Sequence, residues 1–173
     1  MAARSKAVCS QIIDCISKKF EIHIVTSQKF LAIEYHRNKD GFITLHQASY
    51  IECLLERFGM ADCNPTTTPF EPGNLNAQST RTGPTGDYRE VLGSLQYAAS
   101  KTRPDIAQAV NYLSRHAINP TNIDWCVLKR VLRYLSGTKQ MAITYRPKGN
   151  REMIAYCDAN FAGDPDNYRS TSG

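Results

Sequence analysis

Apolar residues at helical spacing open the chain and predict an amphipathic helix over residues 5–20. Its apolar face consists of Val8, Ile12, Cys15, Ile16 and Phe20. An alternating pattern follows and predicts a β-hairpin, with strands at 29–36 and 42–46 joined by an Asn-Lys-Asp-Gly turn. A second helix is expected over 48–58, because helical spacing returns and Gly59 is a favoured helix stop.

Residues 63–87 have no periodic pattern. They hold four of the eight prolines and many Thr, Asn and Gly residues, so we expect a linker and a domain boundary there. Helical spacing then resumes and is interrupted at Pro104, which suits the first turn of a new helix. A last helix is expected over 122–136, followed by a second hairpin with short strands at 142–146 and 153–157.

Composition defines the broad class of the protein. With 173 residues, 42% of them hydrophobic, the chain is long enough for one domain or parts of two, and wholesale disorder is excluded. No apolar run approaches the roughly 20 residues of a membrane span, and the polar, basic start lacks a signal-peptide core. The six cysteines are scattered without a CxxC pair, which indicates reduced thiols. We expect an intracellular protein, in the cytoplasm or nucleus, without a membrane partner.

The net charge of +5 is unevenly distributed along the chain. Residues 1–100 are neutral, residues 101–150 carry a net charge of +7, and residues 151–173 carry −2. A basic segment suits a polyanion, and clustered carboxylates suit a metal ion. A solvated helix face beside a polar tail would give the same distribution, so charge alone leaves both interpretations open.

The helix expected over 122–136 is the main candidate for binding. At about 100° per residue, Lys129, Arg130 and Arg133 form a basic stripe beside a broad apolar face. Such a stripe can follow a phosphate backbone while the apolar face packs on the protein. The alternative is a helix whose Lys and Arg residues only face water.

Asp158, Asp164 and Asp166 form an acidic cluster near the end of the sequence. A strand-borne Asp with carboxylates nearby can hold Mg²⁺ through oxygen ligands. A calcium loop is disfavoured, because Ala162 and Arg169 stand where an oxygen ligand and a Glu are needed. Ordinary turn chemistry, which also uses Asp, Asn, Gly and Pro, is the alternative.

Four stretches of the sequence carry more information than the periodicity. They read LHQASYIECLLERFGMADCNPTTTP (45–69), YREVLGSLQYAASKTRPDIAQAVNYLSRHAINPT (88–121), WCVLKRVLRYLSGT (125–138) and AYCDANFAGDPDNYRSTSG (155–173). Together they resemble, in order and spacing, the part of copia-type LTR-retrotransposon Pol polyproteins that follows the polymerase active site. The resemblance covers about residues 5–173, and it implies a fragment of a reverse transcriptase/RNase H polyprotein.

The resemblance implies an α+β fold in four parts. Residues 1–62 would hold the end of the reverse transcriptase palm, with a primer-grip-like hairpin and the first thumb helix. Residues 63–87 would be a linker, and residues 88–140 would form thumb- or connection-like helices. Residues 141–173 would begin an incomplete RNase H domain. In the intact enzyme the helices would clasp a template–primer duplex of RNA and DNA, and the rest of the Pol polyprotein would be a further partner.

The resemblance also implies roles for single residues. Asp158 matches the family's first RNase H carboxylate and would be a Mg²⁺ ligand once the rest of the site is supplied. The family usually has Gly in place of Ala32, so a change in the primer grip is expected there. The candidates for contacts with backbone phosphates are Lys129, Arg130, Arg133, Arg103 and Lys101.

A YVDD-like string, which carries the polymerase aspartates of this family, is absent from the sequence. One carboxylate does not form a two-metal site. We therefore expect neither polymerase nor nuclease activity from the chain alone, and no tightly bound Mg²⁺. Two other classes stay open, a non-catalytic nucleic-acid-binding remnant and an inert gene-model product.

Overall fold

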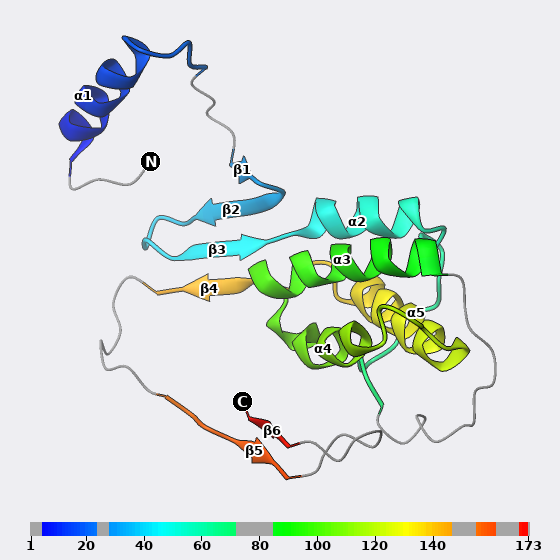
Figure 1. The fold of residues 1–173 in the computed structure, drawn as a ribbon. Helices are drawn as coiled ribbons and strands as arrows, with labels where there is room; N and C mark the ends of the chain where they lie inside the picture. The colour runs from blue at the N-terminus through cyan, green and yellow to red at the C-terminus, as the bar shows by residue number, and fades with distance from the viewer. Residues whose placement is uncertain (1–4, 24–27, 72–84, 147–154, 162–169, 173) are drawn as a thin grey trace.

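The computed structural model describes residues 5–23, 28–71, 85–146, 155–161 and 170–172. Within these residues the protein combines α-helices with a four-stranded antiparallel sheet and a separate two-stranded sheet (Figure 1). The fold is therefore mixed α and β, as predicted. No helix in the described part of the chain is long and apolar enough to cross a membrane.

The first helix, α1 (Lys6–Ser17), lies apart from the other helices (Figure 1). Ser5 caps it, because its hydroxyl oxygen accepts a hydrogen bond from the backbone N–H of Val8 at 3.4 Å. The predicted helix is confirmed, but it ends at Ser17 and not at residue 20. Its predicted apolar face is exposed to solvent, with Phe20 beyond its end 66% exposed.

The larger sheet has the strand order β1-β2-β3-β4. Its strands are β1 (Lys29–Phe30), β2 (Ile33–Arg37), β3 (Ile43–His46) and β4 (Ile143–Tyr145). β2 and β3 form the predicted first hairpin, closed by a turn in which Asn38 Oδ1 accepts the backbone N–H of Phe42 at 2.8 Å. The single strand predicted over 29–36 is wrong, because a turn at Leu31 and Ala32 divides it into β1 and β2. β4 returns to this hairpin from far along the chain.

The predicted second hairpin is wrong in its pairing. We expected residues 142–146 to pair with residues 153–157, but β4 pairs with β3, where Leu45 lies opposite Ile143. Residues 155–157 are outside any strand, and residues 153–154 lie outside the described part of the chain. A short strand is more stable at the edge of an existing sheet than in an isolated hairpin. A separate pair follows, β5 (Ala159–Asn160) with β6 (Thr171–Ser172).

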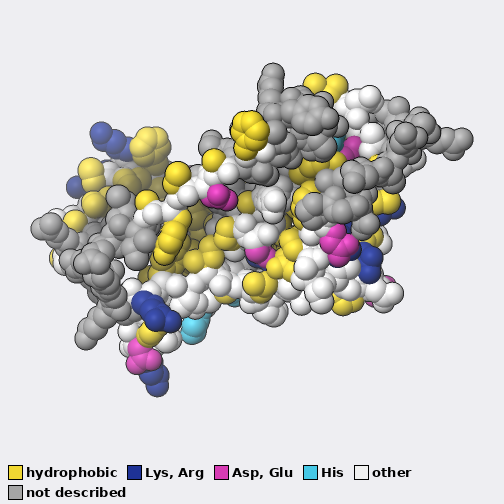
Figure 2. Space-filling view, turned by 90° about the horizontal axis from the view of Figure 1, so that it is seen from below, with side chains coloured by type: hydrophobic (Ala, Val, Ile, Leu, Met, Phe, Trp, Pro, Cys, Tyr) yellow, Lys and Arg dark blue, Asp and Glu magenta, His cyan; other side chains and the backbone are white. Residues whose placement is uncertain are grey.

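The larger sheet has one mostly apolar face. Side chains alternate along a strand, so the register assigns a common face to Phe30, Ile33, Tyr35, Arg37, Ile43, Leu45, Ile143 and Tyr145. Phe30 is 70% exposed, and Tyr35 and Tyr145 are also exposed. In the view from below, hydrophobic side chains gather at the end of the molecule where the sheet lies (Figure 2).

The two-residue turn between β1 and β2 is strained. Leu31 and Ala32 both have positive φ, at 49° and 57°. A two-residue hairpin turn with positive φ at both positions normally uses Asn-Gly, because a Cβ at positive φ costs about 1–2 kcal/mol per residue. Leu31 does not offset this cost by burial, since it is 65% exposed. A Gly in place of Ala32 would relieve part of the strain.

One hydrophobic core joins α2 (Ala48–Arg57), α3 (Thr85–Lys101), α4 (Ala107–Arg115) and α5 (Asn122–Gly137). Each helix turns one apolar face inward, as the spacing predicts. A 3₁₀ turn, Pro104–Ile106, separates α3 from α4 at the predicted proline break. The most deeply buried side chains include Ile51, Leu55, Leu95, Leu113, Leu128 and Leu135.

The hydrophobic core contains residues from both sides of the segment that the sequence predicts as a linker. α2 is buried together with α4 and α5, which follow residues 63–87, and with α3, which begins within that segment at Thr85. The first part of that segment lies along α5, where the backbone N–H of Thr66 donates to the carbonyl of Arg133 at 3.4 Å. A Cβ on Gly137 would lie 2.8 Å from the Cβ of Pro65, so glycine permits this close approach.

The ends of the helices follow local signals in the sequence. Gly59 has a φ of 63° just after α2, as expected of a helix-stopping glycine. Thr121 and Asp124 form a reciprocal capping box at the start of α5, and His116 Nδ1 lies 2.7 Å from Asp124 Oδ1. Burial raises the pKa of the Asp124 carboxyl, but hydrogen bonds from His116 and Thr121 outweigh burial and hold that pKa below its ordinary value.

Candidate nucleic-acid interface

The basic stripe of α5 contains one lysine that is open to solvent. Lys129 is exposed and lines an open hollow of about 380 Å³ together with Trp125, Arg57, Asp87 and Glu90. Glu90 is ion-paired with Arg57. Within the described residues, no ion pair joins its ammonium group to a carboxylate. Lys129 is therefore placed where an approaching anion could reach it.

The two arginines of the stripe are held by the segment that precedes α3. Arg130 donates to the carbonyl and hydroxyl of Thr68 at 3.1 and 2.8 Å, and it is ion-paired with Glu71. Arg133 donates from Nε to the carbonyl of Asn64 at 2.6 Å. These contacts fasten the segment to α5. The arginines thus stabilise the fold, and their predicted phosphate contacts would have to use the donors that remain.

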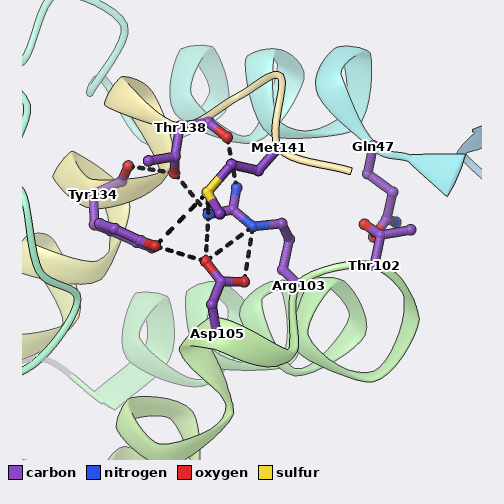
Figure 3. A network of polar contacts seen from close by, with 7 residues as sticks. All are labelled: Gln47, Thr102, Arg103, Asp105, Tyr134, Thr138 and Met141. Carbon is purple, nitrogen blue, oxygen red and sulfur yellow. Dashed lines mark hydrogen bonds and ion pairs between the residues drawn. The ribbon is translucent and has the colours of Figure 1, made fainter. Parts of the chain in front are cut away.

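Arg103 lies in the interior and is 1% exposed (Figure 3). Its guanidinium is ion-paired with Asp105 at 2.7 Å, and it donates to the carbonyl and hydroxyl of Thr138 at 3.0 and 2.6 Å. The hydroxyl of Tyr134 donates to the same carboxylate at 2.8 Å. With its donors directed inward, Arg103 is not placed to contact a phosphate. We assign it to the fold, where it links the end of α3 to the end of α5.

The charges in this network compensate one another. Burial raises the pKa of the Asp105 carboxyl, but hydrogen bonds from Arg103 and Tyr134 outweigh burial and hold that pKa below its ordinary value. Burial, and next the hydrogen bond to Asp105, raise the pKa of the Tyr134 hydroxyl. Asp105 is therefore an anion at neutral pH and balances the buried Arg103.

A second buried polar pair lies beside this network (Figure 3). The hydroxyl of Thr102 donates to Oε1 of Gln47 at 2.8 Å, and both residues are buried. Gln47 directly precedes α2, and Thr102 directly follows α3. The pair therefore fixes the junction of hairpin and α2 against the end of α3. Sequence patterns did not indicate it, because each residue alone looks like an ordinary surface residue.

Lys101 is exposed at the end of α3, and its ammonium nitrogen lies 5.8 Å from the centre of the Tyr97 ring. The Tyr97 ring meets the Tyr50 ring edge-on, with 5.4 Å between their centres. The Tyr97 hydroxyl donates a hydrogen bond to the carbonyl of Leu31. Tyr97 therefore contacts both the lysine and the strained turn, a connection that the spacing of apolar residues did not indicate.

Asp158 is exposed just before β5, and its Oδ1 accepts the backbone N–H of Ala159 at 2.8 Å. Among the residues that the structure describes, no three His, Cys, Asp or Glu side chains are grouped so that they could hold a metal ion. Asp164 and Asp166 lie outside those residues. One carboxylate fits a single ligand position of Mg²⁺ and does not complete a site.

Comparisons with known proteins find transposon polyproteins. The chain is 44% identical over 147 residues to the retrovirus-related Pol polyprotein from transposon RE1 of Arabidopsis thaliana, covering 83% of this chain and 10% of that protein. It is 39% identical over 165 residues to the polyprotein from transposon RE2 of the same plant, with shares of 93% and 11%. It is 33% identical over 186 residues to that from transposon TNT 1-94 of Nicotiana tabacum, with shares of 100% and 14%. No family model and no solved structure matches.

The described fold is an α+β arrangement of a small sheet beside a helical core. The identities over most of the chain confirm the predicted relationship, and the chain is homologous to a segment of the retrovirus-related Pol polyproteins of copia-type transposons. It spans about a tenth of the length of the first two relatives.

Proposed function

We propose that the chain is part of a copia-type reverse transcriptase/RNase H polyprotein and that it grips the template–primer duplex. The observation that carries this proposal is the similarity to three transposon Pol polyproteins over 83–100% of the chain. The role requires an RNA/DNA duplex and the remainder of a Pol polyprotein as partners. It places the chain in the binding part of an RNA-directed DNA polymerase.

The proposed parts follow the packing. β1, β2 and β3 would be the palm-end hairpin with its primer grip, and α2, α3, α4 and α5 the thumb- or connection-like helices. The shared core supports placing α2 with the thumb. β4 pairs with β3, so its contacts favour the hairpin sheet over the RNase H part, which would then begin after Tyr145.

Two exposed lysines are the best-placed groups for phosphate contacts. They are Lys129 on α5 and Lys101 at the end of α3. Both fall in the segment 101–150, which carries a net charge of +7. Lysine binds phosphate as a mobile point charge, so these contacts would add affinity without reading the sequence of the duplex.

Mg²⁺ enters this proposal only through Asp158. In a complete RNase H domain this carboxylate would be one oxygen ligand of the ion, which would supply Lewis-acid chemistry at the phosphate. The described residues group no further ligands around Asp158. We therefore assign Asp158 the binding role alone.

Binding of an RNA–DNA hybrid duplex tests the proposed function. We expect affinity that falls steeply with salt, because each phosphate contact releases counterions. Lys129→Ala should reduce the slope of log K against log salt by about 0.9, the share of one contact. The measurement is fluorescence anisotropy with a labelled hybrid, over about 50 to 200 mM salt.

The matched control for Lys129→Ala is Lys139→Ala. Lys139 follows the end of α5 and is ion-paired with Glu52 at 3.5 Å, so its removal should leave the slope nearly unchanged. If the wild-type chain does not bind the hybrid at the lowest salt, the proposed function is wrong. If Lys129→Ala has the wild-type slope, the contact assigned to this lysine is wrong.

The chain alone is expected to have no catalytic activity. Two-metal nucleotidyl transfer and RNA hydrolysis both need a set of carboxylates, and Asp158 is one. Purified chain should give neither primer extension nor RNA cleavage with Mg²⁺ present. Cleavage by the wild-type chain that disappears in Asp158→Asn would show that the site is complete and would contradict this expectation.

A further inference from the structure

The tip of the β1–β2 hairpin is exposed although its backbone is strained. Phe30 and Leu31 are 70% and 65% exposed, so burial of these side chains does not stabilise the turn. Leu31 and Ala32 nevertheless keep positive φ. Strain that persists without burial points to an outside constraint and often to a functional site.

The constraint at this turn comes from α3. The hydroxyl of Tyr97 donates a hydrogen bond to the carbonyl of Leu31, the first residue of the turn. The Tyr97 ring is itself braced by Tyr50, whose hydroxyl donates to the carbonyl of Ser94 at 3.1 Å. A residue of α3 thus holds the turn in its strained form.

The Tyr97 ring also contacts a positively charged side chain, that of Lys101. Lys101 lies one helical turn after Tyr97, with its ammonium nitrogen 5.8 Å from the centre of the ring. The side chain of Lys101 is exposed. Tyr97 therefore contacts a strained apolar tip on one side and an accessible positive charge on the other.

We propose that Tyr97 is a positioning residue, which holds the Phe30–Leu31 tip and Lys101 as one contact surface for the end of a nucleic-acid duplex. The apolar tip offers a face on which an unstacked base can lie, and Lys101 offers a charge for the adjoining phosphate. A nucleic-acid strand is the occupant that combines these two chemistries. This inference rests on the proposed function and adds residues of α3 to the surface formed by the hairpin.

The test compares two labelled hybrids, one with a recessed 3′ end and one with blunt ends. Tyr97→Phe keeps the ring and removes the hydroxyl. It should weaken binding to the recessed hybrid about fivefold, near the low end of one base–aromatic stack, and leave the blunt hybrid unaffected. The salt slope should stay at the wild-type value, because no charge is lost. Lys101→Gln should reduce the slope by up to about 0.9.

Tyr145→Phe is the matched control, because Tyr145 lies in the same sheet and is 56% exposed. It should bind both hybrids as the wild type does. Failure of the wild-type chain to bind either hybrid would refute the proposed function. Equal binding of the recessed hybrid by Tyr97→Phe and wild type would refute the positioning role alone. The same holds if both hybrids weaken equally together with a lower thermal midpoint, since that pattern indicates a merely structural role.

A second variant tests the link to backbone strain. Ala32→Gly removes one Cβ from the strained turn and keeps Phe30 and Leu31, so the turn should depend less on Tyr97. In this background Tyr97→Phe should weaken binding to the recessed hybrid by less than about twofold. An undiminished loss would show that the hydroxyl does not act through the strained turn, and would overturn the proposal.

Discussion

Replacing Arg103 with methionine is expected to lower the free energy of unfolding by about 3 kcal/mol. The guanidinium is 1% exposed and bonds with Asp105 and Thr138. Methionine keeps much of the aliphatic volume but leaves the Asp105 carboxylate without its charge partner and the Thr138 carbonyl without this donor. The Asp105 side chain is 25% exposed, so water compensates part of its lost charge partner, and the loss is at the low end for a broken buried ion pair.

Urea unfolding followed by far-ultraviolet circular dichroism measures this loss. Lys101→Met is the matched control, because Lys101 is exposed at the end of the same helix, and the change should stay within about 0.5 kcal/mol. The double variant Arg103→Met/Asp105→Asn should recover part of the loss, since it removes the uncompensated charge as well.

The same variants separate a structural role of Arg103 from a phosphate contact. A phosphate contact would appear as a lower salt slope in hybrid binding at nearly unchanged stability. If Arg103→Met is as stable as Lys101→Met and lowers the salt slope, the assignment of Arg103 to the fold is wrong.

Amphipathic helices were predictable from the sequence because burial of one face is a local property. The spacing of Ile51, Leu54 and Leu55 indicates the buried side of α2, and the structure buries all three. Gly59 and Pro104 mark helix boundaries through their own backbone preferences, which need no knowledge of distant residues. The predicted helices in the described part of the chain are accordingly close to the observed ones.

Contacts between distant segments were not predictable in the same way. The strand at 142–146 was recognised from its residues, but its partner β3 depends on how the whole helical core folds. Arg103 looks like any charged residue before a proline until Thr138 lies beside it. The sequence therefore assigned phosphate contacts to the basic positions as a group. The structure distinguishes them, because Arg103 is buried and Lys129 is exposed.

Replacing Leu55 with alanine is expected to lower the free energy of unfolding by about 2–4 kcal/mol. Leu55 is 2% exposed on α2 and belongs to the core that also contains side chains of α3, α4 and α5. Alanine removes apolar contacts and leaves a cavity that the surrounding helices cannot fill completely. Because the core contains residues from both sides of residues 63–87, the loss of stability should also affect the helices that follow this segment.

Trp125 provides the probe, as it is the single tryptophan and lies on α5, beyond residues 63–87. In Leu55→Ala, the urea midpoint of its fluorescence should fall together with that of circular dichroism, as expected of one cooperative unit. Cys53→Ala, at an exposed position of the same helix, should leave both midpoints nearly unchanged. A Trp125 midpoint that stays at the wild-type value while circular dichroism shows an earlier transition would mean that α2 unfolds separately. In that case the domain boundary predicted at 63–87 would also divide the core energetically.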